Sequence, residues 1–192
     1  MPEPPRRSVE LTDPVALRAL AHPTRLALVG LLRRLGPQTA TQAAALLGES
    51  SGSCSFHLRQ LAKYGLVEPA GGGTGREKPW QATAMATSWR GDADSPDAVE
   101  AGVLLSRVLA DTYVGSLYGW LDALPSAPRE WQRAAVFGDT MLYLTPAELD
   151  RLGRAVTGLL EPYVARTVDA GRRPKRARRV IFLHLAFPAG DD

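Results

Sequence analysis

Residues 51–68 constrain the fold of this chain more than any other stretch, because they combine an amphipathic helix, a glycine stop and the start of a strand. The helical run contains no proline and ends at Gly65, the residue type that most readily adopts the left-handed conformation at a helix end. Cys54, Leu58 and Leu61 recur at spacings of four and three, which predicts one buried face. The segment is therefore expected to pack a short helix on a core and to expose the opposite, polar side.

The outward side of this helix carries hydroxyl groups, cations and an aromatic ring, but no acidic residue. Its candidate DNA-contacting residues are Ser51, Ser53, Ser55, Phe56, Arg59, Gln60 and Lys63. Ser51 is also the candidate N-cap of the helix. The DNA major groove presents donors, acceptors and thymine methyl groups, which suit hydroxyls, an arginine fork and an aromatic edge. An ordinary amphipathic helix with a solvated face would give the same pattern, so the neighbouring segments decide between the two interpretations.

Three shorter helices are predicted upstream. Asp13 precedes the first as a cap, Pro23 opens the second, and Thr39 caps the third, which covers 40–47. A tight turn that contains Gly48 joins this third helix to the amphipathic one. Two short helices joined in this way are typical of a helix-turn-helix, whose second helix reads DNA.

Downstream, residues 66–82 predict a β-hairpin with a glycine-rich tip. Arg76 and Lys78 lie on its returning arm, where a wing would contact phosphates. The tip is not expected to bind a nucleotide, because it lacks the lysine and the adjacent hydroxyl residue that a phosphate-cradling loop requires. The order of elements therefore predicts a winged helix-turn-helix.

With these elements in place, residues 13–84 resemble the winged helix-turn-helix of the arsenic-repressor (ArsR) family. The resemblance rests on the segments Ala-His-Pro-Thr-Arg-Leu-Ala-Leu-Val at 21–29, Ser-Phe-His-Leu-Arg-Gln-Leu at 55–61 and Tyr-Gly-Leu-Val at 64–67. It implies a homodimeric bacterial transcription factor, usually a repressor that a bound effector releases. It also implies that Arg25 supports the domain or contacts the DNA backbone, with a solvated arginine as the alternative.

The chain departs from the metal-sensing members of that family. Those members carry paired cysteines on the helix before the reader, or histidine and acidic ligands on a later dimer helix. Here residues 40–47 contain no ligand, and residues 97–121 contain Asp97, Glu100 and Asp111 without a histidine or cysteine. Because the sequence has only three histidines and one cysteine, we expect no zinc-type site and no cofactor.

The single cysteine and two of the histidines are expected to be structural. Cys54 is interpreted as a small buried hydrophobe, with a redox switch beneath the DNA-contacting surface as the alternative. His57, at the boundary of the same helix face, and His184, in a strand-like run, are expected to pack and accept hydrogen bonds.

Beyond a polar linker, the sequence predicts a long helix over 97–121 with an apolar stripe. The members of the stripe are Leu105, Leu109, Tyr113, Leu117 and Trp120. In the resembling family this position is the dimer helix, so the stripe predicts dimerisation; packing within one chain is the alternative.

The last third predicts a strand, a helix and a second strand. The strands are expected over 136–144 and 180–187, and the helix between them starts at a capping box of Thr145 and Glu148. The helix is expected to bury a face made of Leu149, Leu152, Val156, Leu159 and Tyr163. In the resembling family, an addition of this size looks like that of the larger relatives, with an appended sensing or assembly domain.

Aromatic and cationic residues of this last third suggest two further roles. Trp120, Trp131, Phe137, Met141 and Tyr143 could line a small-molecule pocket, although a plain core or interface is the simpler interpretation. Six cations between 172 and 179 predict either a solvated loop or additional phosphate contacts.

Charge and hydropathy agree with a cytoplasmic DNA-binding protein. Residues 1–90 contain 11 Lys and Arg against 6 Asp and Glu, a net charge of +5, whereas residues 91–192 contain 12 against 14, a net of −2. The first range is the expected DNA-binding domain, and the second is the expected dimerisation and effector-binding domain. The N-terminal residues lack an apolar signal and no apolar run reaches about 18 residues, so we expect no membrane segment.

Together these features predict an α+β, mainly α, fold with a winged helix-turn-helix, a long dimerisation helix and a small strand-helix-strand unit. The predicted function is a homodimeric repressor that binds double-stranded DNA at an inverted-repeat operator, and that a small molecule, not a metal, could release. A winged-helix protein-interaction module without sequence-specific DNA binding is the alternative. No catalytic grouping or cofactor fingerprint is recognised in the sequence, so we do not expect an enzyme.

Overall fold

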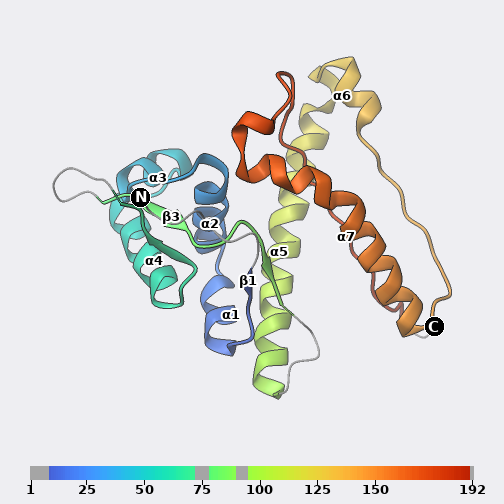
Figure 1. The fold of residues 1–192 in the computed structure, drawn as a ribbon, viewed down its shortest axis with the longest axis horizontal. Coiled ribbons are helices and arrows are strands. Elements are labelled where there is room, and N and C mark those ends of the chain that lie inside the picture. Colours follow the sequence, from blue (N-terminus) through green and yellow to red (C-terminus); the bar gives the residue numbers. More distant parts are fainter. Residues whose placement is uncertain (1–8, 72–77, 90–94, 191–192) are drawn as a thin grey trace. The chain divides into compact units, whose positions relative to one another are not determined.

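The structure, a computed structural model, describes residues 9–71, 78–89 and 95–190 (Figure 1). It is mainly helical, with two small two-stranded sheets among these residues. The chain forms two compact units, Met1–Gly115 and Ser116–Asp192. The predicted class, with a winged helix-turn-helix followed by a long helix, is confirmed. The two units divide inside that long helix, and the predicted functional boundary after residue 90 stays a prediction.

The first unit contains the helix-turn-helix. Its first four helices are α1 (Pro14–Leu20), α2 (Pro23–Leu35), α3 (Ala40–Leu47) and α4 (Ser51–Lys63). Three of them begin as predicted: α2 starts at Pro23, the Asp13 carboxylate accepts the Val15 N–H at 3.0 Å, and Thr39 forms a capping box with Gln42. Gly65 has φ of +67°, so glycine ends α4 in the left-handed region, where a side chain would be strained.

The cap of α4 was predicted one residue too late. Ser50, not Ser51, is the N-cap, since its Oγ accepts the Ser53 N–H at 3.1 Å. Adjacent serines offer the same hydroxyl, and local sequence does not decide which of them stands before the first helical residue.

The core of the first unit forms where the apolar faces of α1, α2 and α4 meet. Cys54, Leu58 and Leu61 are fully buried, as the spacing predicted. Burial raises the pKa of the Cys54 thiol, which agrees with its interpretation as a small hydrophobe. From the other helices, the largest fully buried side chains are Leu17, Leu20, Leu28, Leu31 and Leu105. This core holds α4 by one face only.

The predicted hairpin is present as β2 (Val67–Pro69) paired antiparallel with β3 (Trp80–Ala82). Residues 72–77, which include Arg76 of the predicted returning arm, lie outside the described residues. A second pair, not predicted because each strand has two residues, joins β1 (Val9–Glu10) in parallel with β4 (Thr87–Ser88).

Arg33 connects α2 to the chain that follows the hairpin. Its Nε donates to the Ala84 carbonyl oxygen at 2.8 Å, and its Nη2 donates to the Thr87 hydroxyl. Burial lowers the pKa of the guanidinium to about 10. The charged side chain is therefore held largely out of water by two separate acceptors.

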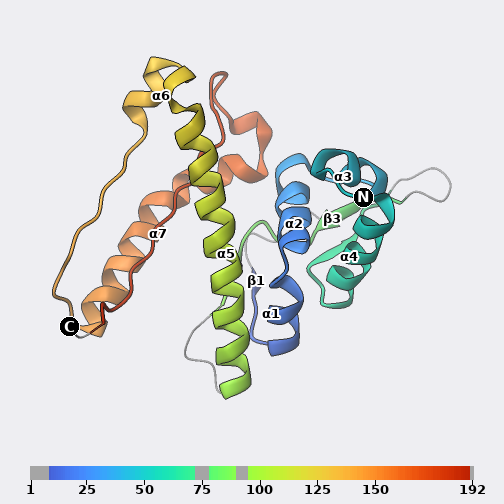
Figure 2. The ribbon, with the colours of Figure 1, turned by 180° about the vertical axis from the view of Figure 1, so that it is seen from behind.

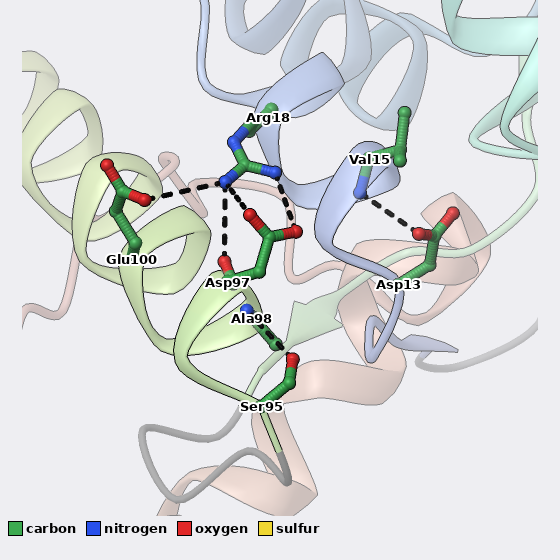
Figure 3. A network of polar contacts seen from close by, with 7 residues as sticks. All are labelled: Asp13, Val15, Arg18, Ser95, Asp97, Ala98 and Glu100. Atoms are coloured by element: carbon green, nitrogen blue, oxygen red, sulfur yellow. Dashed lines mark hydrogen bonds and ion pairs between the residues drawn. The ribbon is translucent and has the colours of Figure 1, made fainter.

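The long helix α5 (Pro96–Ala123) begins against the first unit. Figure 3 shows the Arg18 guanidinium of α1 between the carboxylates of Asp97 and Glu100. The hydrogen bond between Arg18 and Asp97 raises the pKa of the Arg18 guanidinium and lowers the pKa of the Asp97 carboxyl group. Ser95 caps the helix by accepting the Ala98 N–H at 3.2 Å. The ion pairs are exposed, so they orient the start of α5 more than they stabilise it.

The second unit contains the end of α5, a short 3-10 turn (Leu124–Ser126), α6 (Arg129–Ala134) and α7 (Pro146–Val168), followed by a 3-10 turn (Ala170–Arg172). The predicted capping box is present, since Thr145 and Glu148 exchange backbone and side-chain hydrogen bonds.

No described helix is alone long and apolar enough to cross a membrane, although α1 and α2 would reach that length together across their 85° bend.

Two predictions for this unit were wrong. Residues 136–144 and 180–187 are extended but belong to no strand in the described chain, and the expected apolar face of α7 is exposed or half-buried. Apolar and β-branched composition gives a segment the propensity for a strand, but a ladder also needs a neighbouring strand. Neither segment has that neighbour within the described chain.

Candidate nucleic-acid interface

The candidate interface is the outward side of α4. The buried side chains of Cys54, Leu58 and Leu61 fix the rotation of the helix about its axis. Of the predicted contact residues, Ser51, Phe56, Arg59 and Lys63 are exposed, whereas Ser53, Ser55 and Gln60 are half-buried. The structure therefore brings the α4 residues of the prediction onto one accessible surface.

Contacts on this surface leave its polar groups available. Arg59 Nη1 donates to Ser55 Oγ at 3.3 Å, which extends the guanidinium along the helix. The Lys63 ammonium lies 5.5 Å from the centre of the Tyr64 ring, a distance at which a cation is attracted to the aromatic face. Phe56 is 50 % exposed. An exposed apolar ring beside an arginine fork can contact a thymine methyl group while the fork binds guanine.

Gly52 is part of the surface, although it was not among the predicted contact residues. A Cβ built on Gly52 would meet only Ser50 Oγ, at 3.9 Å, so the fold itself does not require a glycine. The first turn of a helix presents free N–H groups and a partial positive charge, which attract phosphate. A missing side chain at the second helical residue leaves that backbone open to close approach. Glycine is unfavourable inside a helix, so its presence at position 52 is a signal that sequence reasoning could have used.

Two histidines join α4 to the start of α2. The rings of His22 and His57 lie 4.6 Å apart, and His22 caps α2 by accepting the Thr24 N–H at Nδ1, at 3.2 Å. Arg25 lies beside them and donates to the Arg18 carbonyl at 3.4 Å. The sequence indicated a packed His57 but not its partner, because no local pattern relates residues 35 positions apart.

The histidine pair favours the neutral imidazoles. Burial is the main cause that lowers the pKa of both His22 and His57, and the Arg25 charge lowers them further, while Glu49 acts in the opposite direction. Arg25 Nε and His57 Nδ1 are buried without a hydrogen-bond partner among the described residues. Protonation would place positive charge next to Arg25 and would remove the acceptor that caps α2.

Acidification is therefore expected to destabilise the first unit. Because the pKa of each histidine is lower in the folded than in the unfolded chain, their contribution is complete above about pH 6.5 and is lost as the pH falls through the folded-state value. We expect the thermal midpoint to decrease between pH 7 and pH 5. His22→Asn keeps a capping acceptor that does not titrate, so this variant should show a shallower decrease; equal slopes in both proteins would contradict the assignment.

The residues predicted to contact the DNA backbone outside α4 differ in their exposure and in their contacts. Lys78 is exposed just before β3, and Arg76 lies outside the described residues. Arg25 is half-buried and bound to a carbonyl of α1, which fits support of the domain better than a solvated arginine.

The predicted dimerisation stripe divides along α5. Leu105 is fully buried in the core of the first unit, and Leu109 packs against that core. Tyr113 and Trp120 are half-buried, whereas Leu117 is 37 % exposed. The first part of the stripe thus packs within its own chain, and its role in dimerisation stays a prediction.

The predicted ligand-binding residues differ in their exposure. Met141 is 92 % exposed, and Phe137 and Tyr143 are exposed as well. Trp120 and Trp131 are half-buried, and the Arg178 guanidinium lies 5.4 Å from the Trp131 ring centre. A hollow of about 210 Å³ in the first unit, lined by Pro23, Thr24, Ala27, Leu47 and Glu49, is smaller than the ~300 Å³ at which ligand pockets begin. A small-molecule site stays a prediction.

The described residues contain no group of three or more His, Cys, Asp or Glu positioned to hold a metal ion. Comparison with known protein families matched one region of the chain. No curated protein matches the chain. Residues 20–70, which include α2, α3, α4 and β2, match the model of a helix-turn-helix domain family that is related to ArsR-type regulators. The chain is therefore similar over these residues to a helix-turn-helix domain, which suggests a DNA-binding regulator.

Proposed function

We propose that this protein is a cytoplasmic, non-enzymatic transcriptional repressor that reads a specific DNA sequence as a homodimer. The observation that carries the proposal is the outward side of α4: it belongs to a helix-turn-helix, is free of acidic residues, and presents Arg59, Phe56 and serine hydroxyls to solvent.

In this proposal α4 lies in the major groove. Arg59 binds a guanine edge with its two-pronged guanidinium, and Phe56 contacts a thymine methyl group. The hydroxyls of Ser51, Ser53 and Ser55 bind neighbouring base edges. The backbone contacts, which fix the position of the helix without reading sequence, are assigned to Gln60, Lys63, Arg76 and Lys78, with Arg25 in support.

The proposed assembly sets the form of the operator. Two reading helices related by a two-fold axis require an inverted repeat, with half-sites about 34 Å apart along one side of the duplex. The resemblance of residues 13–84 to the ArsR family supports repression and release by an effector, which we propose to be a small molecule bound in the second unit.

Selection of bound duplexes from a random DNA pool tests the proposal. We expect the wild-type protein to enrich an inverted repeat at near-physiological salt. Arg59→Ala is expected to lose about 1–3 kcal/mol at that site, roughly 5- to 150-fold in affinity, and to relax the preference at one base pair of each half-site. Arg107→Ala is the matched control, since it removes an equally exposed arginine from α5 outside the helix-turn-helix.

The outcomes separate the roles of Arg59. An equal loss of affinity on every sequence would make this arginine a phosphate contact, and an equal loss for Arg107→Ala would make the effect one of net charge. A wild-type protein that enriches no site would overturn sequence-specific binding and favour a protein-interaction module.

A further inference from the structure

The second unit exposes two extended apolar segments, 136–144 and 180–187, which Figure 2 shows as bare traces outside any sheet. Every large hydrophobic side chain in them is at least 42 % exposed. They are Val136, Phe137, Met141, Leu142, Tyr143 and Leu144 in the first segment and Val180, Ile181, Phe182, Leu183, Leu185 and Phe187 in the second. Soluble proteins rarely leave so much contiguous apolar surface uncovered unless another molecule binds it.

The backbone N–H and C=O groups of the two segments lack hydrogen-bond partners within the described chain, just as their side chains lack apolar contacts that would bury them. No backbone group of 136–144 or 180–187 takes part in a hydrogen bond within the described chain. Neither segment contains a proline, so every residue has a donor and an acceptor for a ladder. Native proteins protect such edges with charge, proline, a bulge or a cover, and here the only formal charge is that of Asp139. These edges are suited to pairing with other strands.

Helix α7 adds an uncovered apolar face to the same unit. Leu152, Leu159, Tyr163 and Val164 are all exposed on it, although their spacing is that of a buried helix face. Covering the unit therefore requires strands for the edges and an apolar surface for the helix. A single added peptide strand satisfies one edge and leaves both the strand faces and the helix exposed.

We infer that a second copy of this chain covers 136–144, 180–187 and α7 through a two-fold interface in which strands of both copies form one sheet. A second copy supplies two more strands and a second apolar helix face, so each copy satisfies the other by the same contacts. The inference rests on the proposed homodimer and names the surface that forms it. It assigns assembly to the second unit and not to the part of α5 that packs in the first.

The exposed area is sufficient for a stable dimer. A covered aromatic side chain buries about 150–250 Å², and Phe137, Tyr143, Phe182 and Phe187 are each more than half exposed. These four side chains alone thus offer roughly 450–750 Å² per copy. The eight aliphatic side chains of the same segments add to this, and a standard interface needs about 800 Å² per partner. The scarcity of charge in both segments matches the core of an interface between copies.

Sedimentation equilibrium of the full-length chain tests the inference. We expect the wild type to have twice the 20.7 kDa mass of one chain at micromolar concentration. Phe182→Asp and Met141→Asp, one in each segment, should both give the single-chain mass with an unchanged helical circular dichroism signal. Val103→Asp introduces the same charge at an exposed position of the part of α5 that belongs to the first unit and should leave the dimer intact.

Amide hydrogen exchange identifies what covers the segments. We expect 136–144 and 180–187 to be protected in the wild type and to lose protection on dilution and in Phe182→Asp. Protection in a monomer would mean that the chain covers its own segments, and a monomer protected only on adding another protein would mean a different partner; either result overturns the inference. Dissociation by Val103→Asp alone would also overturn it.

The DNA result is independent of these outcomes. A dimer formed through these segments that enriches no DNA site would overturn the proposed function and leave this interface standing. A monomeric wild type that still reads DNA through Arg59 would overturn this interface and leave sequence-specific DNA binding by α4 standing. If both hold, Phe182→Asp should keep the base preference of a single half-site and lose the added affinity of the inverted repeat.

Discussion

Replacing Leu58 by alanine is expected to lower the free energy of unfolding of the first unit by about 2–5 kcal/mol. Leu58 is fully buried beside Cys54 and Leu61, so the substitution removes apolar contacts and leaves a cavity beneath the reading helix. Because domains of this size are stable by only about 5–15 kcal/mol, a large share of the total would be lost. DNA binding should weaken with it, since a loosened α4 no longer holds its outward side in place.

Urea unfolding measures this loss of free energy, and hydrogen exchange of the α2 and α4 amides shows whether it is located in these helices. Leu46→Ala is the matched control, because Leu46 lies on α3 of the same helix-turn-helix and is 53 % exposed. The control should change stability by no more than about 0.5 kcal/mol. Equal effects of the two substitutions would show that the core is not assembled around α4 as described.

Leu105→Ala is expected to cost a similar amount, about 2–5 kcal/mol, and to act on the first unit although it lies in α5. Leu105 has no exposed surface and belongs to the core cluster with Leu28, Leu31 and Leu58. A residue that only served a dimer interface would instead affect the assembly. Thermal unfolding and the mass in solution, measured on the same samples, separate these two effects.

The neighbouring Leu104→Ala provides the control for this prediction. Leu104 is 44 % exposed on the same turn of the helix, so its substitution changes helix composition equally without opening a cavity. We expect Leu104→Ala to leave the unfolding transition nearly unchanged. A loss of dimer mass without a loss of stability in Leu105→Ala would contradict the packing described for α5.

Sequence predicted the features of the fold that depend on neighbouring residues. The cap at Thr39, the glycine stop at Gly65 and the buried face of α4 follow from short-range hydrogen bonding and from the helical repeat. The same reasoning failed by one residue at Ser50, where adjacent serines offer identical chemistry. It also predicted that Leu105 would be buried, but periodicity does not specify against which surface.

Contacts between distant residues and contacts with other molecules were beyond this reasoning. The contact between the His22 and His57 rings arises only when α2 meets α4. Segments 136–144 and 180–187 have the composition of strands, yet a strand exists only when its neighbour is present. The common side of the α4 residues could be predicted because they belong to one helix, whereas the ligand set was drawn from several elements; contact of either set with DNA or a ligand stays a prediction.

The hydrogen bonds of Arg33, which connect α2 to the chain after the wing, limit which residues can replace this arginine in related sequences. Arg33 donates from two different nitrogens to Ala84 and Thr87, and a lysine carries one compact ammonium that cannot match this spread. An arginine-to-lysine exchange, scored as conservative in a comparison of sequences, would leave an acceptor unmet here. The strand β4 that contains Thr87 also holds β1, so one such exchange would loosen the N-terminal strand and the wing together.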